Sequence, residues 1–225
     1  MPKPDTHTPH PSRQLLAAQE AAVAKLAYVA EQPGAAAVLC GPPGTGKSLV
    51  LQAAARMLES AGHACRIVSW RSLREAAPGD CPDVLLVDAV DDAAAGELAA
   101  VLDRCWAVNP QSRIILAGAG RMLTLIARDA RLERRMGLRA VLTPCSRAET
   151  QRLVADRLAT GHDQASGAMT AAAVAETIHE ITGGIPADIE RLASLAALVA
   201  ADRSTSRLTP ELIERVHGRL AVTAA

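Results

Sequence analysis

The 225-residue chain contains no phenylalanine, and its only aromatic residues are Tyr28, Trp70 and Trp106. Because 49% of the residues are nevertheless apolar, we expect a sizeable core built from leucine, isoleucine, valine and alanine. The formal net charge at pH 7 is zero. The chain therefore lacks the overall basic field that drives nucleic-acid binding.

The sequence also lacks long apolar runs and an N-terminal export signal. No run approaches the roughly 20 residues that a membrane span needs, and the N-terminus has no apolar segment typical of signal peptides. The five cysteines form no C-x-x-C pair and have no histidine at metal-ligand spacing, so we expect buried thiols in a reducing compartment. These absences predict a cytoplasmic protein without a membrane span.

What the chain does contain is a complete phosphate-binding motif. Residues 41–48 match the pattern G-x-x-x-x-G-K-S/T at every position, between an apolar strand pattern and a helical pattern. Glycines let backbone N–H groups turn toward a phosphate, and the following helix directs its positive end at the same anion. The predicted nucleotide-binding residues are Gly41, Pro42, Pro43, Gly44, Thr45, Gly46, Lys47, Ser48 and Leu49. The motif predicts ATP and Mg²⁺ as ligands, with Lys47 on the phosphates and Ser48 on the metal.

A second feature typical of nucleotide sites is a buried strand that ends in a carboxylate. The apolar run 84–87 is followed directly by Asp88. A carboxylate at the end of a strand beside the glycine loop can hold Mg²⁺ through a water molecule. We therefore predict that Asp88 shares the metal with Ser48 and takes part in catalysis.

The order of predicted elements indicates the fold class. Strands are predicted at residues 35–40, 64–70, 84–87, 113–117 and 138–142, with helices between them. This alternation predicts an α/β fold, a doubly wound parallel five-stranded sheet of the P-loop NTPase type. After residue 142 only helices are predicted, and the first opens with a capping box formed by Ser146 and Glu149. The predicted parts are a flexible tail at 1–12, an ATPase core at 13–143 and a four-helix lid subdomain at 144–225.

These motifs, in this order, resemble those of the AAA+ ATPase superfamily. The matching segments are the glycine loop at 41–48, Leu-Leu-Val-Asp at 85–88 and Gly-Gly-Ile-Pro at 183–186. Within AAA+, the chain is similar to the general secretion pathway protein A group and the TniB-like transposition ATPases, which share Pro-Ser-Arg at 11–13 and Leu-Thr-Pro at 208–210. The resemblance covers about residues 11–222. It implies a nucleotide-dependent homo-oligomer that acts on a protein partner of a secretion or transposition system.

The chain departs from the pattern of that group where hydrolysis is concerned. The position after the strand aspartate is usually Glu, which polarises the attacking water, but here it is Ala89. Asp91 or Asp92 can substitute, and we name Asp91 as a candidate catalytic residue. Residues 115–119, at the end of the fourth strand and just after it, offer no polar side chain, although the resemblance implies a polar sensor there. The lid position usually occupied by Arg is Ala187, and the nearest arginine is Arg191.

Charge is unevenly distributed although it sums to zero. Residues 75–103 carry eight acidic and no basic side chains, whereas residues 121–152 carry eight arginines and three acids. Two solvated faces would explain this, as would head-to-tail assembly of subunits. The resemblance places a trans-acting catalytic arginine at Arg134 or Arg135, and we name Arg135. A nucleic-acid partner for the arginine-rich stretch has little support, because no aromatic residue accompanies it.

Three functions remain open at this point. The first is an AAA+ ATPase that couples ATP binding and hydrolysis to assembly or remodelling of a partner complex. The second is a nucleotide-binding switch or assembly subunit that does not hydrolyse ATP efficiently, which the alanines at 89, 119 and 187 favour. The third is a small-molecule P-loop kinase, since arginine-rich lids also occur in kinases.

Overall fold

The computed structural model describes residues 14–29, 31–76, 79–94, 96–159, 168–202 and 208–223. The predicted flexible tail, residues 1–12, lies outside them. No helix among the described residues is long and apolar enough to cross a membrane.

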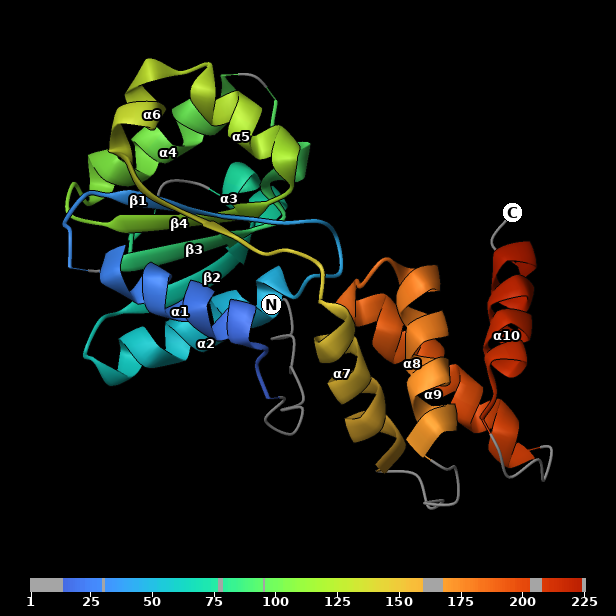
Figure 1. Cartoon of the computed structure of the whole chain (residues 1–225). Helices are drawn as coiled ribbons and strands as arrows, with labels where there is room; N and C mark the ends of the chain where they lie inside the picture. The colour runs from blue at the N-terminus through green and yellow to red at the C-terminus, as the bar shows by residue number, and fades with distance from the viewer. Residues whose placement is uncertain are drawn as a thin grey trace, which may run out of the picture.

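A five-stranded, fully parallel sheet forms the centre of the larger part of the chain (Figure 1). Its strands are β1 (Ala36–Cys40), β2 (Cys65–Ser69), β3 (Val84–Asp88), β4 (Arg113–Gly118) and β5 (Met136–Val141). They lie in the order β2-β3-β4-β1-β5, so that β1 is flanked by β4 and β5. Helices cover both faces of the sheet (Figure 1). The predicted doubly wound α/β fold of the P-loop type is confirmed.

Alternating side chains of the central strands enter two separate hydrophobic clusters. In β1, Val38 belongs to the cluster on one face, and Ala37 and Leu39 belong to the cluster on the other. Strands buried on both faces read as uninterrupted apolar runs rather than as alternating patterns. This is why the apolar runs of the sequence predicted the inner strands correctly.

Helices of the α/β part divide between the two faces of the sheet. They are α1 (Ala17–Val29), α2 (Lys47–Ser60), α3 (Trp70–Glu75), α4 (Glu97–Val108), α5 (Gly120–Ala127) and α6 (Ala130–Arg135), with a 3₁₀ turn η1 at Val90–Asp92. Side chains of α1 and α2 pack on one face, and those of α3 to α6 pack on the other. Figure 1 shows this layering, with α1 and α2 on the opposite side of the sheet from α4, α5 and α6.

Two short helices were not predicted from the sequence. Trp70 was expected to end the second strand, but it begins α3, because the Ser69 side chain accepts a hydrogen bond from the Ser72 N–H (3.1 Å) and caps the helix. Asp129 caps α6 in the same way, accepting from the Arg131 N–H at 2.9 Å. Each helix has six residues, too few to show a helical period.

The C-terminal part is entirely helical among its described residues. It contains α7 (Arg147–Ala159), α8 (Ala168–Thr182), α9 (Pro186–Asp202) and α10 (Pro210–Thr223). These helices share a hydrophobic cluster of their own, separate from the two clusters of the sheet. The predicted capping box is present: the Ser146 N–H donates to Glu149 Oε2 (2.8 Å) and the Glu149 N–H donates to Ser146 Oγ (3.3 Å). The separate clusters support a boundary at 143–144, which stays a prediction.

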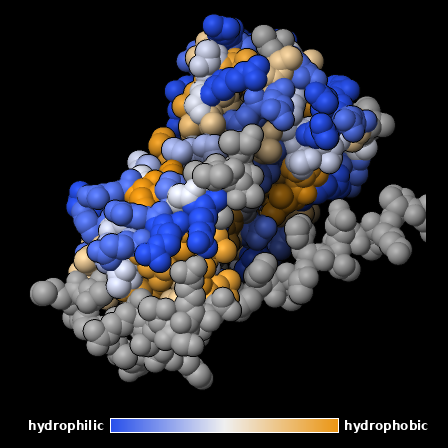
Figure 2. Space-filling model, turned by 90° about the vertical axis from the view of Figure 1, so that its right-hand side faces the viewer, coloured by the Kyte–Doolittle hydropathy of each residue, from blue (hydrophilic) through white to orange (hydrophobic). Residues whose placement is uncertain are grey.

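The surface of the lid is mixed in character. Seen from the lid side of the molecule, hydrophilic side chains alternate with apolar patches (Figure 2). Leu198 of α9 is 65% exposed, the largest value among the exposed large apolar side chains of the described residues.

The cysteines are free thiols in the structure. Cys40, Cys81 and Cys145 are buried, and Cys65 and Cys105 are half-buried. Burial raises the pKa of Cys65, Cys105 and Cys145 to about 11 each. No group of three or more potential metal ligands occurs among the described residues. The thiols of Cys65, Cys105 and Cys145 therefore stay protonated at neutral pH.

A glycine pair between α8 and α9 contacts the segment that precedes α7 within the lid. Gly183 and Gly184 have φ values of +59° and +76°, which end α8 and turn the chain into α9. The Gly184 carbonyl accepts from the Cys145 N–H at 2.7 Å. A Cβ atom on Gly184 would lie 2.5 Å from the Cys145 carbonyl oxygen, whereas one on Gly183 would meet nothing within 4 Å. Gly184 thus holds two segments together at a backbone-to-backbone contact.

This difference gives a matched pair of stability predictions. Gly183→Ala should lower the free energy of unfolding by about 1 to 2 kcal/mol, the cost of a left-handed backbone for an L residue. Gly184→Ala should cost a further 1 to 3 kcal/mol or so, because its methyl group also collides with the backbone of Cys145. Urea denaturation of both variants tests this. Equal losses would contradict the close contact.

Candidate nucleotide site

The glycine loop lies at the carboxyl end of β1, in the middle of the sheet. It runs from Gly41 to Gly46 and leads directly into α2. The Gly41 N–H donates to the Gly118 carbonyl at the end of β4 (3.2 Å), which fixes where the loop starts. Gly44 and Gly46 have φ values of +80° and +90°, a backbone conformation that L side chains rarely adopt. The glycines of the motif thus stand where the turn requires them.

The Lys47 side chain folds back onto the loop. Its Nζ donates to the carbonyl oxygens of Gly41 (2.8 Å) and Pro42 (3.0 Å). The Pro42 oxygen also accepts from the Thr45 hydroxyl at 2.8 Å. The ammonium group therefore already lies at the mouth of the loop, bonded to neutral acceptors. A phosphate there would offer a stronger, charge-assisted bond.

Ser48 and Asp88, the two residues that the sequence predicts as metal ligands, lie next to each other beside the loop. The Ser48 hydroxyl donates to Asp88 Oδ2 at 2.5 Å, and the Ala89 N–H donates to Asp88 Oδ1 at 2.8 Å. A hydroxyl and a carboxylate side by side are hard oxygen donors of the kind that Mg²⁺ prefers. These two residues fit the predicted metal.

Ala89 redirects the chain after β3. Its φ of +56° makes it the only non-glycine residue with positive φ among the described residues, and the 3₁₀ turn η1 follows at once. The turn carries Asp91 to the end of β4, where its Oδ1 accepts a hydrogen bond from the Ala119 N–H. Arg121 donates to the Asp91 backbone carbonyl at 3.1 Å. Asp92 is exposed.

Asp91 thus supplies a polar group at the carboxyl end of β4, where residues 115–119 have no polar side chain. Its carboxylate lies within electrostatic reach of Cys40, the last residue before the loop. The pKa of Cys40 is raised mainly by burial; Lys47 opposes this rise and Asp91 adds to it. The sequence named Asp91 as a candidate, but it did not show that Asp91 would occupy the end of β4. No sequence pattern marks this hydrogen bond, because Asp91 precedes Ala119 by 28 positions and reaches it only through the left-handed turn at Ala89.

The lid contacts the loop directly. The Ala187 N–H donates to the Gly44 carbonyl at 3.1 Å. A Cβ on Gly44 would lie 2.6 Å from Cγ2 of Ile185, so only glycine allows this approach without displacement. Arg191, the arginine nearest to Ala187 in the sequence, instead forms an ion pair with Asp188 at 3.3 Å.

Gln19 is a site residue that the sequence analysis missed. It lies on α1, is 4% exposed, and donates from Nε2 to the Thr45 carbonyl of the loop at 3.0 Å. No motif marks this contact, since Gln19 precedes Thr45 by 26 positions. The only feature of the sequence that points to Gln19 is a polar residue on an otherwise apolar helix face.

Arg135 lies near the amino-terminal ends of the strands, whereas the loop follows the carboxyl end of β1. It precedes Met136, which pairs with Ala36 at the start of β1, while the loop follows the end of β1. The length of β1 separates these two ends by about 13 Å. The Arg135 guanidinium lies over the Trp106 ring, 4.3 Å from its centroid, and donates to the Gly34 carbonyl at 3.4 Å. The structure therefore does not bring Arg135 to the glycine loop of its own chain.

The acidic and arginine-rich stretches also pair within the chain. Arg131 bonds to Asp103 at 3.2 Å, which links the end of one stretch to the other. Part of the charge separation noted in the sequence is thus neutralised internally. Exposed pairs of this kind contribute little to stability, typically about 0 to 1 kcal/mol.

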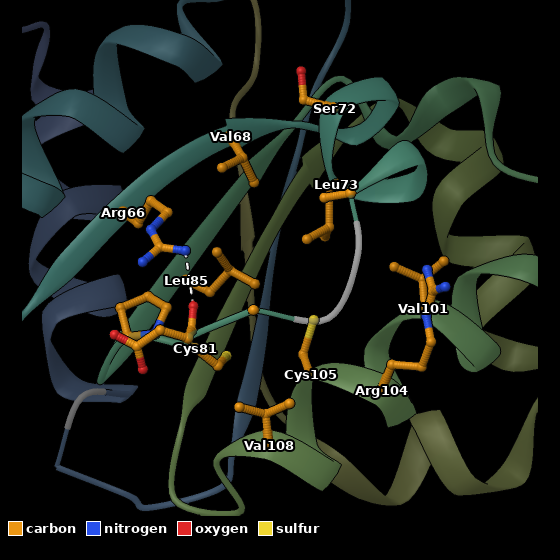
Figure 3. A pocket seen from close by; sticks show the side chains of 14 residues that line it. Arg66, Val68, Ser72, Leu73, Cys81, Leu85, Val101, Arg104, Cys105 and Val108 are labelled. Atoms are coloured by element: carbon orange, nitrogen blue, oxygen red, sulfur yellow. Dashed lines mark hydrogen bonds between the residues drawn. The ribbon is translucent and has the colours of Figure 1, made fainter.

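A cavity of about 230 Å³ lies away from the loop, between β2, β3, α3 and α4 (Figure 3). Its walls are mainly apolar and include Val68, Leu73, Leu85, Val101, Cys105 and Val108. At its rim, Arg66 donates to the Asp80 carbonyl at 2.8 Å, which Figure 3 draws as a dashed line. No residue of the glycine loop lines this cavity, so it is not the phosphate site.

Solved structures of other proteins have a similar fold. A mutant of RuvB from Thermotoga maritima superposes with a TM-score of 0.65 at 17% identity, covering 90% of this chain and 70% of that one. The AAA domain of FIGL-1 in complex with ADP gives 0.61 at 17%, covering 90% and 80%. The ADP form of the Aeropyrum pernix ORC2 protein gives 0.65 at 12%, covering 93% and 70%. The fold is that of the AAA+ ATPases.

The AAA+ fold includes both the sheet and the helical lid, since 90% or more of the chain is covered in these three comparisons. No protein-family model matches the chain, and no curated protein matches its sequence. At identities of 12% to 17%, these similarities establish the fold alone. The narrower resemblance to general secretion pathway protein A and TniB-like ATPases stays a prediction.

Proposed function

We propose that this protein is an AAA+ ATPase that binds ATP with Mg²⁺ and couples its nucleotide state to assembly or remodelling of a partner complex. The observation that carries the proposal is the Ser48–Asp88 hydrogen bond beside the glycine loop. It joins the two motifs, 40 positions apart in the sequence, at one point next to Lys47. The ADP complexes of FIGL-1 and ORC2, which share the fold, support the choice of an adenine nucleotide.

Each residue of the site has a defined task in this proposal. Lys47 exchanges the carbonyls of Gly41 and Pro42 for phosphate oxygens, and backbone N–H groups of the loop bind the remaining charge. Ser48 and Asp88 hold the metal. When bound, Mg²⁺ neutralises charge on the phosphates during phosphoryl transfer to water.

Asp91 is the proposed residue that orients the attacking water. Its Oδ1 is fixed by the Ala119 N–H, while Oδ2 has no partner among the described residues. The carboxylate is therefore held at the end of β4 with one oxygen still able to accept a proton. General bases placed in this way typically contribute about 10²- to 10⁴-fold to a rate.

A hydrolysis-deficient switch is the second candidate function. Two observations favour it: the Ala89 side chain cannot activate water, and the Ala187 side chain has no group that can bond a phosphate. In this alternative, ATP binding sets the position of the lid and the assembly state without efficient turnover.

Assembly is the third part of the proposal. Arg135 lies too far from the nucleotide of its own chain, so we place it at the nucleotide of a neighbouring subunit in a head-to-tail homo-oligomer. The partner we propose is a protein of a secretion or transposition system, on the strength of the resemblance at 11–13, 183–186 and 208–210.

Binding should depend on Lys47. Replacing it with alanine removes a charge-assisted contact to the phosphates, worth about 1.5 to 3 kcal/mol, or roughly 10- to 150-fold in Kd. Isothermal titration with Mg-ATP measures the change, and Lys25→Ala, which removes an exposed lysine on α1, is the control. Equal affinities for wild type and Lys47→Ala would rule out the loop as the site.

Turnover should identify the base. If Asp91 orients water, Asp91→Asn lowers steady-state phosphate release about 10²-fold or more, while Asp92→Asn has little effect. If the chain is a switch, wild-type release is slow and Ala89→Glu raises it by a similar factor. A wild type with rapid release that is unchanged in Asp91→Asn would contradict the role given to Asp91.

Assembly should depend on nucleotide and on Arg135. Light scattering should show larger species with Mg-ATP at low salt and smaller ones at high salt, because exposed charges are screened beyond about 8 Å at physiological ionic strength. Arg135→Ala should lower phosphate release by about 10³-fold or more while Kd changes little. Arg128→Ala, an exposed arginine of the same stretch, is the control. A monomer in every nucleotide state would contradict this part of the proposal.

A further inference from the structure

The first residues of the N-terminal helical segment contact three separate parts of the molecule. Leu15 packs against the hydrophobic cluster beneath the sheet, and Leu16 packs against the cluster of the lid. Gln19, one turn further on, contacts the glycine loop. This segment therefore connects the sheet, the lid and the phosphate loop within five residues.

The Gln19 amide uses both of its polar groups in this connection. Nε2 donates to the Thr45 carbonyl at 3.0 Å, and Oε1 accepts from the Leu16 N–H at 3.0 Å. Burying an amide costs free energy unless its polar groups are hydrogen-bonded. Both bonds are therefore needed, and together they restrain the position of the amide. The Thr45 peptide and the Leu16 backbone are thus held in a fixed relation.

The lid holds the neighbouring carbonyl of the loop. Gly44, directly before Thr45, accepts from the Ala187 N–H at 3.1 Å. Two consecutive loop carbonyls therefore have partners outside the loop, one on the lid and one on α1. In a planar trans peptide the C=O and the N–H point in opposite directions. Any turn of an N–H toward a bound phosphate therefore rotates the carbonyl that the lid or Gln19 holds.

The geometry points to Gln19 as a positioning residue that couples occupancy of the phosphate loop to the lid. Phosphate binding reorients the 44–45 and 45–46 peptides, and Gln19 transmits this change through Leu16 to the hydrophobic cluster of the lid. The device takes over the coupling that a lid arginine would supply at Ala187. The inference rests on the proposed function, since it requires that the loop binds a nucleotide.

Coupling of this kind is reciprocal. If nucleotide binding stabilises one position of the lid, then that position raises nucleotide affinity by the same factor, typically about 5- to 150-fold. Removing the Gln19 contacts should therefore uncouple the lid and weaken binding, but it should not abolish binding, because Lys47, Ser48 and Asp88 remain.

The test is hydrogen–deuterium exchange on the full chain, with and without saturating Mg²⁺ and a non-hydrolysable ATP analogue. In wild type we expect the analogue to slow exchange in peptides covering residues 183–189. In Gln19→Leu this slowing should disappear although the analogue still binds by titration. Gln52→Leu, which replaces an exposed glutamine on α2, should behave as wild type.

A second variant separates coupling from a loss of folding. Leu16→Ala keeps the Gln19 amide and removes only the packing against the lid, so it should also lose the slowing. Gln19→Glu cannot donate to the Thr45 carbonyl and should behave as Gln19→Leu does. Thermal melting identifies any variant that is unfolded.

The outcomes distinguish the two proposals. A wild type that does not bind the analogue overturns the proposed function, and the coupling with it. A wild type that binds, together with Gln19→Leu or Leu16→Ala variants that bind and keep the slowing at 183–189, overturns the coupling alone.

Discussion

The arrangement of the site depends on one six-residue loop, because both the N–H and the carbonyl group of its peptides need hydrogen-bond partners. N–H groups that turn inward toward an anion leave carbonyls that turn outward, and an outward carbonyl needs a donor. Lys47 bonds the oxygens of Gly41 and Pro42, the lid bonds that of Gly44, and α1 bonds that of Thr45. The loop thereby brings α1 and the lid together beside the start of α2, although α1 and the lid are far apart in the sequence.

Much of this arrangement could be predicted from the sequence, for identifiable reasons. The inner strands are buried on both faces, so their apolar runs are unambiguous, and the glycine loop has a pattern that few other structures require. Asp88 could be predicted because it ends an apolar strand whose carboxyl end lies beside the loop in this fold class. Because the sheet is parallel, the carboxyl ends of β1 and β3 lie at the same side of it, which places Asp88 near the start of α2.

The rest of the site depends on contacts that leave little trace in the sequence. Asp91 reaches β4 only because Ala89 adopts a left-handed conformation that nothing in an alanine predicts. Gln19 belongs to the site through one side-chain bond across 26 positions. The helices α3 and α6 are set by capping side chains and not by periodicity. For Asp91 and Gln19 a tertiary contact decided the outcome, whereas α3 and α6 depend on local caps and are too short to show a helical period.

The stacking of Arg135 on Trp106 has a consequence for any surface that meets it. The ring is itself fixed, because the Trp106 Nε1–H donates to the Ser112 carbonyl at 3.0 Å and the residue is buried. A long side chain usually loses rotamer entropy when an interface immobilises it, at a cost of about 0.5 to 1.5 kcal/mol. Arg135 has given up part of that freedom before any encounter. The exposed Arg135 side chain is therefore preorganised for a contact, whereas exposed arginine side chains are otherwise mobile.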